Sequence, residues 1–440
     1  MRLATQTADV RIAREDLASR IAEVVLFVFV IWTFDVLDPK LNVVEFSALS
    51  LRTNVAEISE SNPLNQLKWV ALAAVAGLAF LLAPERLLRV ARLGWPLMLL
   101  FALCLLSTAW AGHPETTFRR SVALIVSAFA LMAAVTYIVH WHRALFVIFL
   151  ALCCALAVNL AVLPLPVAFD EFGNLRAATG HKNTLGAQAA IGLFVGFTVW
   201  RFVDRRLLRL VIAGYMAAWL GLLVASVSTT SIALVVLVPF AVWVLSGLSK
   251  LVRLNVAILL AAGLLFGLVG LGLMAFAAGF TPTDAARVLT GDPTLTGRTQ
   301  IWDFMLAHIS QAWVIGHGFG SFWGVGFDAP NLHASHYYIR LLNQAHNGYL
   351  DLLVHIGLLG LALVVATVFH FGAAAAALRP RDPTLHSFVW LLFLFALVHN
   401  LTESSLLIPF NPIWHITLLA LFLAYRGAAE ALAEPGGPTS

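Results

Sequence analysis

Long apolar runs dominate this chain and restrict its fold more than any other feature. A helix that crosses a bilayer needs about 20 mainly apolar residues, and about twelve runs approach that length. Only 11% of the residues are charged, which excludes a soluble enzyme, a disordered protein and a nucleic-acid-binding protein. We therefore predict an all-α integral membrane protein with about twelve transmembrane helices. The expected spans are residues 21–37, 67–84, 94–112, 121–139, 144–166, 184–200, 210–227, 229–248, 256–280, 347–370, 387–404 and 412–426.

The distribution of Lys and Arg predicts the orientation, because cytoplasmic loops of membrane proteins are enriched in these residues. With a cytoplasmic N-terminus, 17 of the 27 Lys and Arg residues fall in cytoplasmic segments and 10 fall outside. Both termini are then cytoplasmic, and the longest extramembrane segment faces outward. The expected organisation is a cytoplasmic N-terminal arm (1–20), transmembrane helices 1–9 (21–280), a large outer loop with a short amphipathic helix (281–346), transmembrane helices 10–12 (347–426) and a disordered tail (427–440).

Three basic residues, Arg176, His181 and Lys182, precede the apolar run at 184–200. In the predicted orientation this helix begins outside, so the positive end of its dipole and its free backbone N–H groups face outward. Further cations at this end are unfavourable unless an anion binds there. The pattern indicates a phosphate-binding site, and contact with lipid headgroups is the alternative interpretation.

A second basic pair, Arg119 and Arg120, directly precedes the expected span at 121–139. The same argument applies to this outward helix start. Contact with lipid phosphates is the favoured interpretation here, and Arg120 is a candidate diphosphate-binding residue.

The large outer loop contains a segment with the periodicity of an amphipathic helix. Its apolar side chains recur at helical spacing: Ile301, Trp302, Met305 and Ile309. Thr299 is the expected N-cap of this helix. Arg298 lies just ahead of it, so a cation again meets a helix N-terminus, which indicates a bound anion.

His346 lies at the boundary between the outer loop and the span that follows, where an imidazole can act as a general base. Asp351 is five residues further on, about 140° around a helix, and so cannot orient His346 along the same helix. Glu403, an acidic residue near another outer span end, is the best candidate partner. The alternative interpretation is a capping pair formed by His346 and Asn347.

Other chemistries find little support in the sequence. His333 and His336 have a spacing compatible with metal binding, but few carboxylates accompany them, so we expect no metal or other cofactor. The expected spans show no helix pairs broken by Gly or Pro and hardly any charges near the midplane. That pattern argues against an ion-coupled carrier.

Three glycine-rich or histidine-containing motifs occur together in the outer loop. They are Gly297-Arg298 with Ile301-Trp302, then Gly316-His317-Gly318-Phe319-Gly320-Ser321-Phe322-Trp323, then Ala345-His346-Asn347-Gly348-Tyr349-Leu350 with Gly357-Leu358-Leu359-Gly360. Their combination resembles the O-antigen ligase and polymerase superfamily over roughly residues 90–425. The stretch His181-Lys182-Asn183-Thr184-Leu185-Gly186 looks most like the exopolysaccharide polymerase branch of that superfamily.

The resemblance implies a bacterial inner-membrane enzyme that transfers a glycan from undecaprenyl diphosphate to an acceptor hydroxyl at the periplasmic face, without a metal. It implies that His346 and Arg298 are the essential histidine and loop arginine. For a second essential basic residue it favours Arg176, with Lys182 next. The implied partners are the lipid-linked glycan donor, a glycan or lipid-linked acceptor and membrane lipids, with no nucleic acid.

These observations together predict a metal-independent, inverting glycosyltransferase that acts as a surface polysaccharide polymerase. His346 and Arg298 are the expected catalytic residues, and Arg176, Lys182, His181 and Arg120 are expected to bind the diphosphate. Asn347 and Glu403 are expected to support them. An O-antigen ligase that transfers the glycan to lipid A-core is the alternative within the same class. A flippase or other transporter of lipid-linked glycans is the alternative in a different class.

Overall fold

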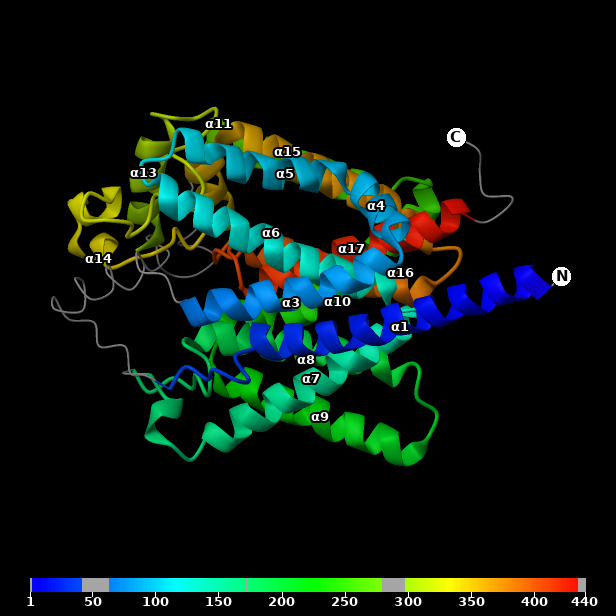
Figure 1. Ribbon diagram of the computed structural model, residues 1–440. Helices are drawn as coiled ribbons and strands as arrows, with labels where there is room; N and C mark the ends of the chain where they lie inside the picture. Colours follow the sequence, from blue (N-terminus) through cyan, green and yellow to red (C-terminus); the bar gives the residue numbers. More distant parts are fainter. Residues whose placement is uncertain (1, 42–62, 171, 279–296, 434–440) are drawn as a thin grey trace.

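The computed structural model describes residues 2–41, 63–170, 172–278 and 297–433 (Figure 1). Over these ranges the chain is helical, and its one β-bridge joins Phe169 to Leu175. The helices are α1 (Arg2–Thr33), α3 (Pro63–Leu82), α4 (Pro84–Leu93), α5 (Trp95–Leu106), α6 (Pro114–Tyr137), α7 (Trp141–Val162), α8 (Lys182–Trp200), α9 (Arg206–Ala225), α10 (Thr229–Val252), α11 (Val256–Ala278), α13 (Arg298–Ile309), α14 (Tyr337–Arg340), α15 (Gly348–Leu378), α16 (Pro383–His399) and α17 (Pro412–Ala433).

Several helices have the length and composition of membrane spans. Within the described ranges seven helices meet both criteria, and the number rises to eight if α3 and α4, bent by 106° at their junction, form one broken span. Two shorter apolar helices, Trp95–Ala109 and Pro383–His399, accompany them. Every one of the twelve expected runs lies on a helix. The chain is thus an all-helical integral membrane protein, and twelve crossings remain a prediction.

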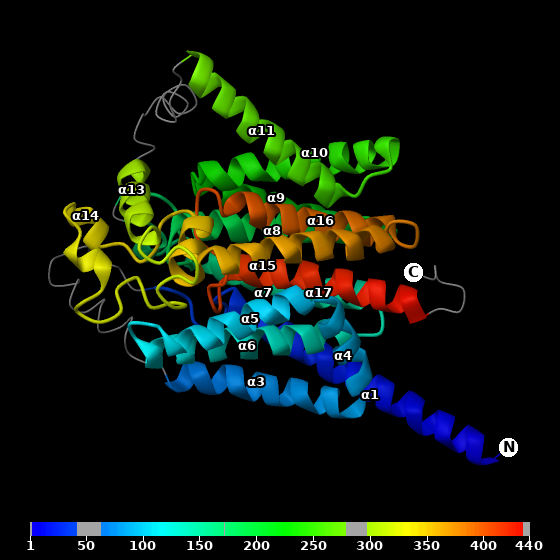
Figure 2. The ribbon, with the colours of Figure 1, turned by 90° about the horizontal axis from the view of Figure 1, so that it is seen from above.

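The helices pack side by side as a bundle with two distinct ends (Figures 1 and 2). The outer segment, residues 297–346 with α13 and α14, covers one end, which we call the site end. α1 begins and α17 ends at the other end, which we call the opposite end. α17 lies inside the bundle against α6, α15 and α16, and 72% of its apolar window is buried. A helix that is apolar on all sides is stable in such a central position.

Four boundaries differ from the sequence expectation. The N-terminal arm is helical and continuous with the first span, as part of α1. Residues 427–433, expected to be disordered, extend α17, because this alanine-rich stretch favours a helix and Arg426 pairs with Glu430 one turn on (2.8 Å). α6 begins at Pro114, so Arg119 and Arg120 lie inside the helix rather than before it. α13 begins at Arg298, so Thr299 is not its N-cap.

The expectation of unbroken spans was also wrong. α15 has non-helical backbone at Ile356 and Gly357, where its ladder of hydrogen bonds is interrupted. The loop after α13 fills the break: Leu358 N donates to Trp313 O (2.8 Å), and Gly318 N donates to His355 O (2.9 Å). Backbone polar groups inside a membrane must be paired within the protein, and this loop provides the partners.

Glycine makes this close contact between loop and helix feasible. Gly316 and Gly357 have φ values of +68° and +63°, a region that side-chain-bearing residues rarely adopt. A Cβ at Gly316 would collide with the backbone of His355, and one at Gly357 would collide with the backbone of Val314. At Gly316 the glycine-rich motif therefore serves the contact between two backbone segments.

Candidate active site

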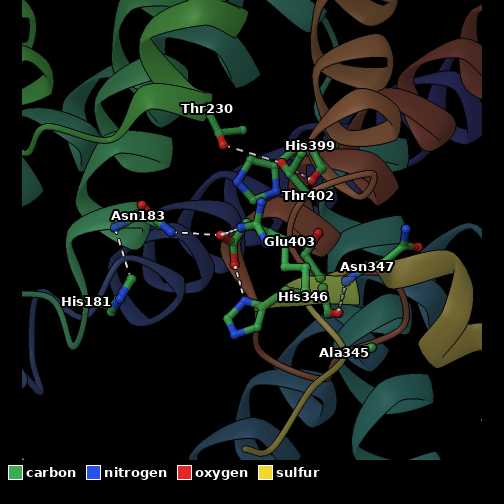
Figure 3. Close-up of polar contacts among 12 residues, drawn as sticks. His181, Asn183, Thr230, Ala345, His346, Asn347, His399, Thr402 and Glu403 are labelled. Atoms are coloured by element: carbon green, nitrogen blue, oxygen red, sulfur yellow. Dashed lines mark hydrogen bonds and ion pairs between the residues drawn. The ribbon is translucent and has the colours of Figure 1, made fainter. Parts of the chain in front are cut away.

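A single carboxylate, Glu403, collects three side-chain hydrogen bonds at the site end of the bundle (Figure 3). Asn183 Nδ2 donates to Glu403 Oε1 (2.7 Å), and an Arg298 guanidinium nitrogen lies 3.3 Å from the same oxygen. His346 Nδ1 lies 3.1 Å from Oε2. The structure therefore brings together His346, Arg298 and Glu403, which the sequence analysis singled out separately.

Four elements that are distant in sequence supply these side chains. Arg298 is the first residue of α13, and Asn183 lies in the first turn of α8. His346 directly precedes Asn347, the N-cap of α15, and Glu403 lies in the connection between α16 and α17. Because all four elements begin or end at the site end, the bundle itself determines this convergence.

The surroundings of Glu403 keep it ionised. Its side chain is only 9% exposed, and burial alone would raise the pKa of the carboxyl group. The hydrogen bond from His346 and the positive charge of Arg298 help to outweigh burial, so the pKa lies below its usual value. An ionised carboxylate can only accept hydrogen bonds.

The charge on Glu403 determines which ring nitrogen of His346 carries the hydrogen. Because Glu403 only accepts, Nδ1 of His346 is the donor, and in the neutral ring the lone pair lies on Nε2. No described residue hydrogen-bonds to Nε2, which points away from Glu403 in Figure 3. A histidine held in this way can accept a proton at Nε2, since the carboxylate also stabilises the imidazolium that results.

The backbone of His346 is strained, and its neighbours hold the strain. Its φ is +50°, in the left-handed region that non-glycine residues seldom adopt. Asn347 N donates to Ser404 Oγ (3.1 Å), and Ala345 N donates to Asp351 Oδ2 (3.0 Å). Contacts on both sides therefore fix the one residue whose side chain must meet Glu403. Strained residues held in this way are concentrated at functional sites.

Asp351 organises the chain around His346 without touching the imidazole. This buried carboxylate accepts hydrogen bonds from Trp323 Nε1 (2.7 Å), from Ala345 N and from Ser404 Oγ. The sequence analysis excluded Asp351 as a direct partner of His346. Its role in the structure is to join the outer segment, the start of α15 and the residue next to Glu403.

The three basic residues ahead of α8 do not share one environment. His181 is the N-cap of α8, and its Nδ1 accepts from Asn183 N (3.1 Å), so its ring is neutral. Burial lowers its pKa, and nearby Glu403 opposes the effect. Lys182 Nζ lies 3.4 Å from Asn174 Oδ1. Arg176 is buried in its own loop, where its Nε donates to Val167 O (3.1 Å).

A cavity of about 850 Å³ lies next to the Glu403 cluster. Arg119 and Arg120 of α6 line it, and Arg120 also donates to Gly320 O. Gln344 and Ser404 line the same cavity, and they lie two residues before His346 and one residue after Glu403. The second basic pair of the sequence analysis thus borders a space that reaches the immediate neighbourhood of the histidine.

Asn183 is the site residue that sequence reasoning did not assign. It lies within the His181-Lys182-Asn183 stretch, but an uncharged amide gave no reason to single it out. Its amide donates to Glu403, and its backbone N–H is capped by His181. Only the packing of α8 against α16 makes this contact predictable.

The comparisons with known proteins agree with this picture. Residues 213–365 match the model of a family described as O-antigen ligase. This part of the chain is thus similar to that family. It is also 29% identical over 276 residues to the exopolysaccharide production protein ExoQ of Rhizobium meliloti (strain 1021). That match covers 59% of this chain and 61% of ExoQ, which is less than two thirds of the relative.

These matches confirm the resemblance to the O-antigen ligase and polymerase superfamily that the sequence motifs predicted. The O-antigen ligase match contains Arg298 and His346. Asn183 and Glu403 lie outside it, on either side, and complete the cluster only in the folded chain.

Proposed function

We propose that this protein is a membrane glycosyltransferase that transfers a glycan from undecaprenyl diphosphate to an acceptor hydroxyl at the periplasmic face. In this proposal it acts as a polymerase of a surface polysaccharide, with a second lipid-linked repeat unit as acceptor. The O-antigen ligase match, the similarity to an exopolysaccharide production protein and the apolar helices support the reaction class. The geometry of His346 and Glu403 carries the mechanism.

The proposed step begins with proton removal. The acceptor hydroxyl donates its hydrogen to Nε2 of His346, and Glu403 stabilises the imidazolium that forms. The acceptor oxygen forms a bond to the anomeric carbon while the bond from that carbon to the phosphate oxygen breaks. The electron pair leaves with the undecaprenyl diphosphate, and attack from the opposite face inverts the anomeric carbon. No metal is part of this scheme.

The leaving diphosphate gains negative charge, and the proposal assigns its stabilisation to Arg298. This guanidinium is held by Glu403 at the first residue of α13. Helix N-termini of this kind bind phosphate. Lys182, Arg120 and His181 are further candidates for contact with the diphosphate. Arg176, which is buried and whose Nε donates to Val167 O, also remains a proposed diphosphate contact.

The cavity beside the cluster suits the lipid-linked substrate in this proposal. Val70 of α3 and Phe118 of α6 line it, and their side chains are 55% and 54% exposed. Apolar side chains of this kind can contact the isoprenoid chain, while Arg119 and Arg120 offer charge to the phosphates.

The decisive experiment is reconstitution of the purified protein in liposomes with a lipid-linked repeat unit as the substrate. We expect longer glycan chains from the wild type and none from His346→Ala. His336→Ala, which alters an exposed histidine of the outer segment, is the matched control and should leave polymerisation unchanged. Normal chain extension by His346→Ala would contradict the mechanism. Movement of the substrate across the bilayer without new linkages would identify a transporter instead.

A further inference from the structure

A basic cavity lies at the opposite end of the bundle, away from His346. It encloses about 410 Å³ between the end of α10, the start of α11, the last turns of α15 and the start of α16. Three cations line it: Lys250, Arg253 and Arg379. No Asp or Glu lines it in the described part of the chain. The sequence analysis predicts that this end is cytoplasmic.

The cavity is held open by specific contacts. Arg379 at the end of α15 donates to Ser249 Oγ and to Ser246 O of α10, both at 3.1 Å. Lys250 and Arg253 have no ion-pair partner among the described residues. Like charges gathered without a counter-charge repel each other. An anion bound between them would remove this repulsion.

His386 adds a second, independent indication of a ligand. Its side chain lines the same cavity, and the residue is only 4% exposed. Its Nδ1 lies 2.8 Å from Ala375 O, and because a carbonyl only accepts, Nδ1 carries the hydrogen. Nε2 is then a buried acceptor, and it has no hydrogen-bond partner among the described residues. Buried acceptors are almost always paired, so a ligand hydroxyl is the complementary group.

An apolar groove adjoins the basic cavity. It has a volume of about 710 Å³, runs between α8, α9, α10 and α16, and shares Lys250 with the basic cavity. Its walls include Phe197 and Trp243, which are 58% and 72% exposed. Large exposed apolar side chains on a membrane-spanning bundle face lipid chains, so the groove is suited to an acyl chain that ends near Lys250.

We propose that the groove and the basic cavity together bind one anionic phospholipid whose headgroup carries a free hydroxyl, namely phosphatidylglycerol. An acyl chain occupies the groove, and the phosphate lies between Lys250 and Arg253. A glycerol hydroxyl of the headgroup donates to Nε2 of His386. The lipid thereby connects α10 to α16 and stabilises the bundle at the end remote from the candidate active site.

The test measures the thermal unfolding of the purified full-length protein in detergent with added lipid. Phosphatidylglycerol should raise Tm by on the order of 3–5 °C, as expected for a ligand near saturation. Lys250→Gln combined with Arg253→Gln should abolish at least half of this shift. Arg205→Gln combined with Arg206→Gln is the matched control, since it removes two cations ahead of α9 that line neither cavity, and it should retain the shift.

Two further arms define the ligand. Phosphatidylethanol, an anionic phosphodiester whose headgroup has no hydroxyl, should stabilise the wild type less than phosphatidylglycerol, and His386→Leu should abolish that preference. Equal shifts from phosphatidylcholine or from inorganic phosphate would overturn the proposal, as would an unchanged shift in the Lys250 and Arg253 variant. If that double variant fails to fold, native mass spectrometry of Lys250→Gln decides. Retention of phosphatidylglycerol at the wild-type level would then refute the site.

Discussion

Glu403→Gln tests the candidate active site most directly, because it keeps the shape of the side chain and removes its charge. The two carboxylate oxygens accept from three donors, on His346, Arg298 and Asn183. Glutamine offers one oxygen and one NH2 group, so in either orientation an NH2 group faces a donor. The variant therefore cannot satisfy both His346 and the other two residues.

The size of the effect follows from this mismatch. If the oxygen faces Arg298 and Asn183, the NH2 group forces Nδ1 of His346 to accept, and Nε2 then carries the hydrogen and cannot act as a base. The wrong histidine tautomer costs up to about 10⁴-fold in the serine protease triad. If the oxygen faces His346, the hydrogen bonds from Arg298 and Asn183 are lost, each worth about 1.5–3 kcal/mol, or roughly 10- to 150-fold. We expect kcat to fall by about 10²–10⁴-fold.

The assay is chain extension in liposomes, with initial rates measured over a range of substrate concentrations. Glu430→Gln, the same substitution at an exposed residue of α17, is the control and should keep the wild-type rate. A folded Glu403→Gln variant with kcat within about threefold of the wild type would refute the assignment of His346 as a base held by Glu403.

Three further predictions use other parts of the structure. His181 caps α8 through a neutral ring, and burial lowers its pKa. The cap therefore contributes fully to stability above about pH 6.5, and this contribution is lost as the pH falls through the lowered pKa of His181 in the folded protein. His181→Asn keeps a capping side chain without titration, so its Tm should fall less than that of the wild type between about pH 7.5 and pH 5, and equal slopes would argue against the cap. Gly357→Ala should destabilise the protein by about 2–4 kcal/mol, because it combines a positive φ with a collision against Val314. Gly221→Ala in α9, with open space around it, should leave Tm unchanged or raise it slightly in the same thermal scan, because Ala favours a helix over Gly. Arg120→Gln should raise KM for the lipid-linked substrate by about tenfold with little effect on kcat, because Arg120 lines the cavity and is not part of the Glu403 cluster. A reduced kcat at unchanged KM would instead assign Arg120 to the chemical step.

The apolar runs were sufficient to predict the helices, because a bilayer leaves few alternatives to an apolar stretch of that length. The partnership of His346 and Glu403 could be proposed from sequence for a similar reason. Both residues lie at span ends on the same predicted side. Arg298 followed from its position at a helix start. These inferences depend on the side of the membrane on which a residue is predicted to lie. That side follows from the number of spans that precede the residue.

Side-chain directions could not be predicted in the same way. The Nε of Arg176, for example, donates to a carbonyl of its own loop, and nothing in the local sequence indicates that contact. Asn183 was passed over because its partner, Glu403, follows 220 residues later. The break in α15 was missed because Ile356 and Gly357 lie within an apolar run, and the groups that satisfy the broken backbone come from the loop after α13.

That break has a mechanical consequence for the chain around His346. The first eight residues of α15, from Gly348 to His355, form a short rod of about two turns that ends where the loop at 313–318 is bonded to it. The rod is attached to the longer part of the helix through two non-helical residues, Ile356 and Gly357. The orientation of His346 therefore depends more on the segment between α13 and α15 than on the part of α15 that follows Gly357. Shortening or replacing the loop at 313–318 should therefore change the orientation of the imidazole. Repacking the part of α15 that follows Gly357 should leave that orientation unchanged.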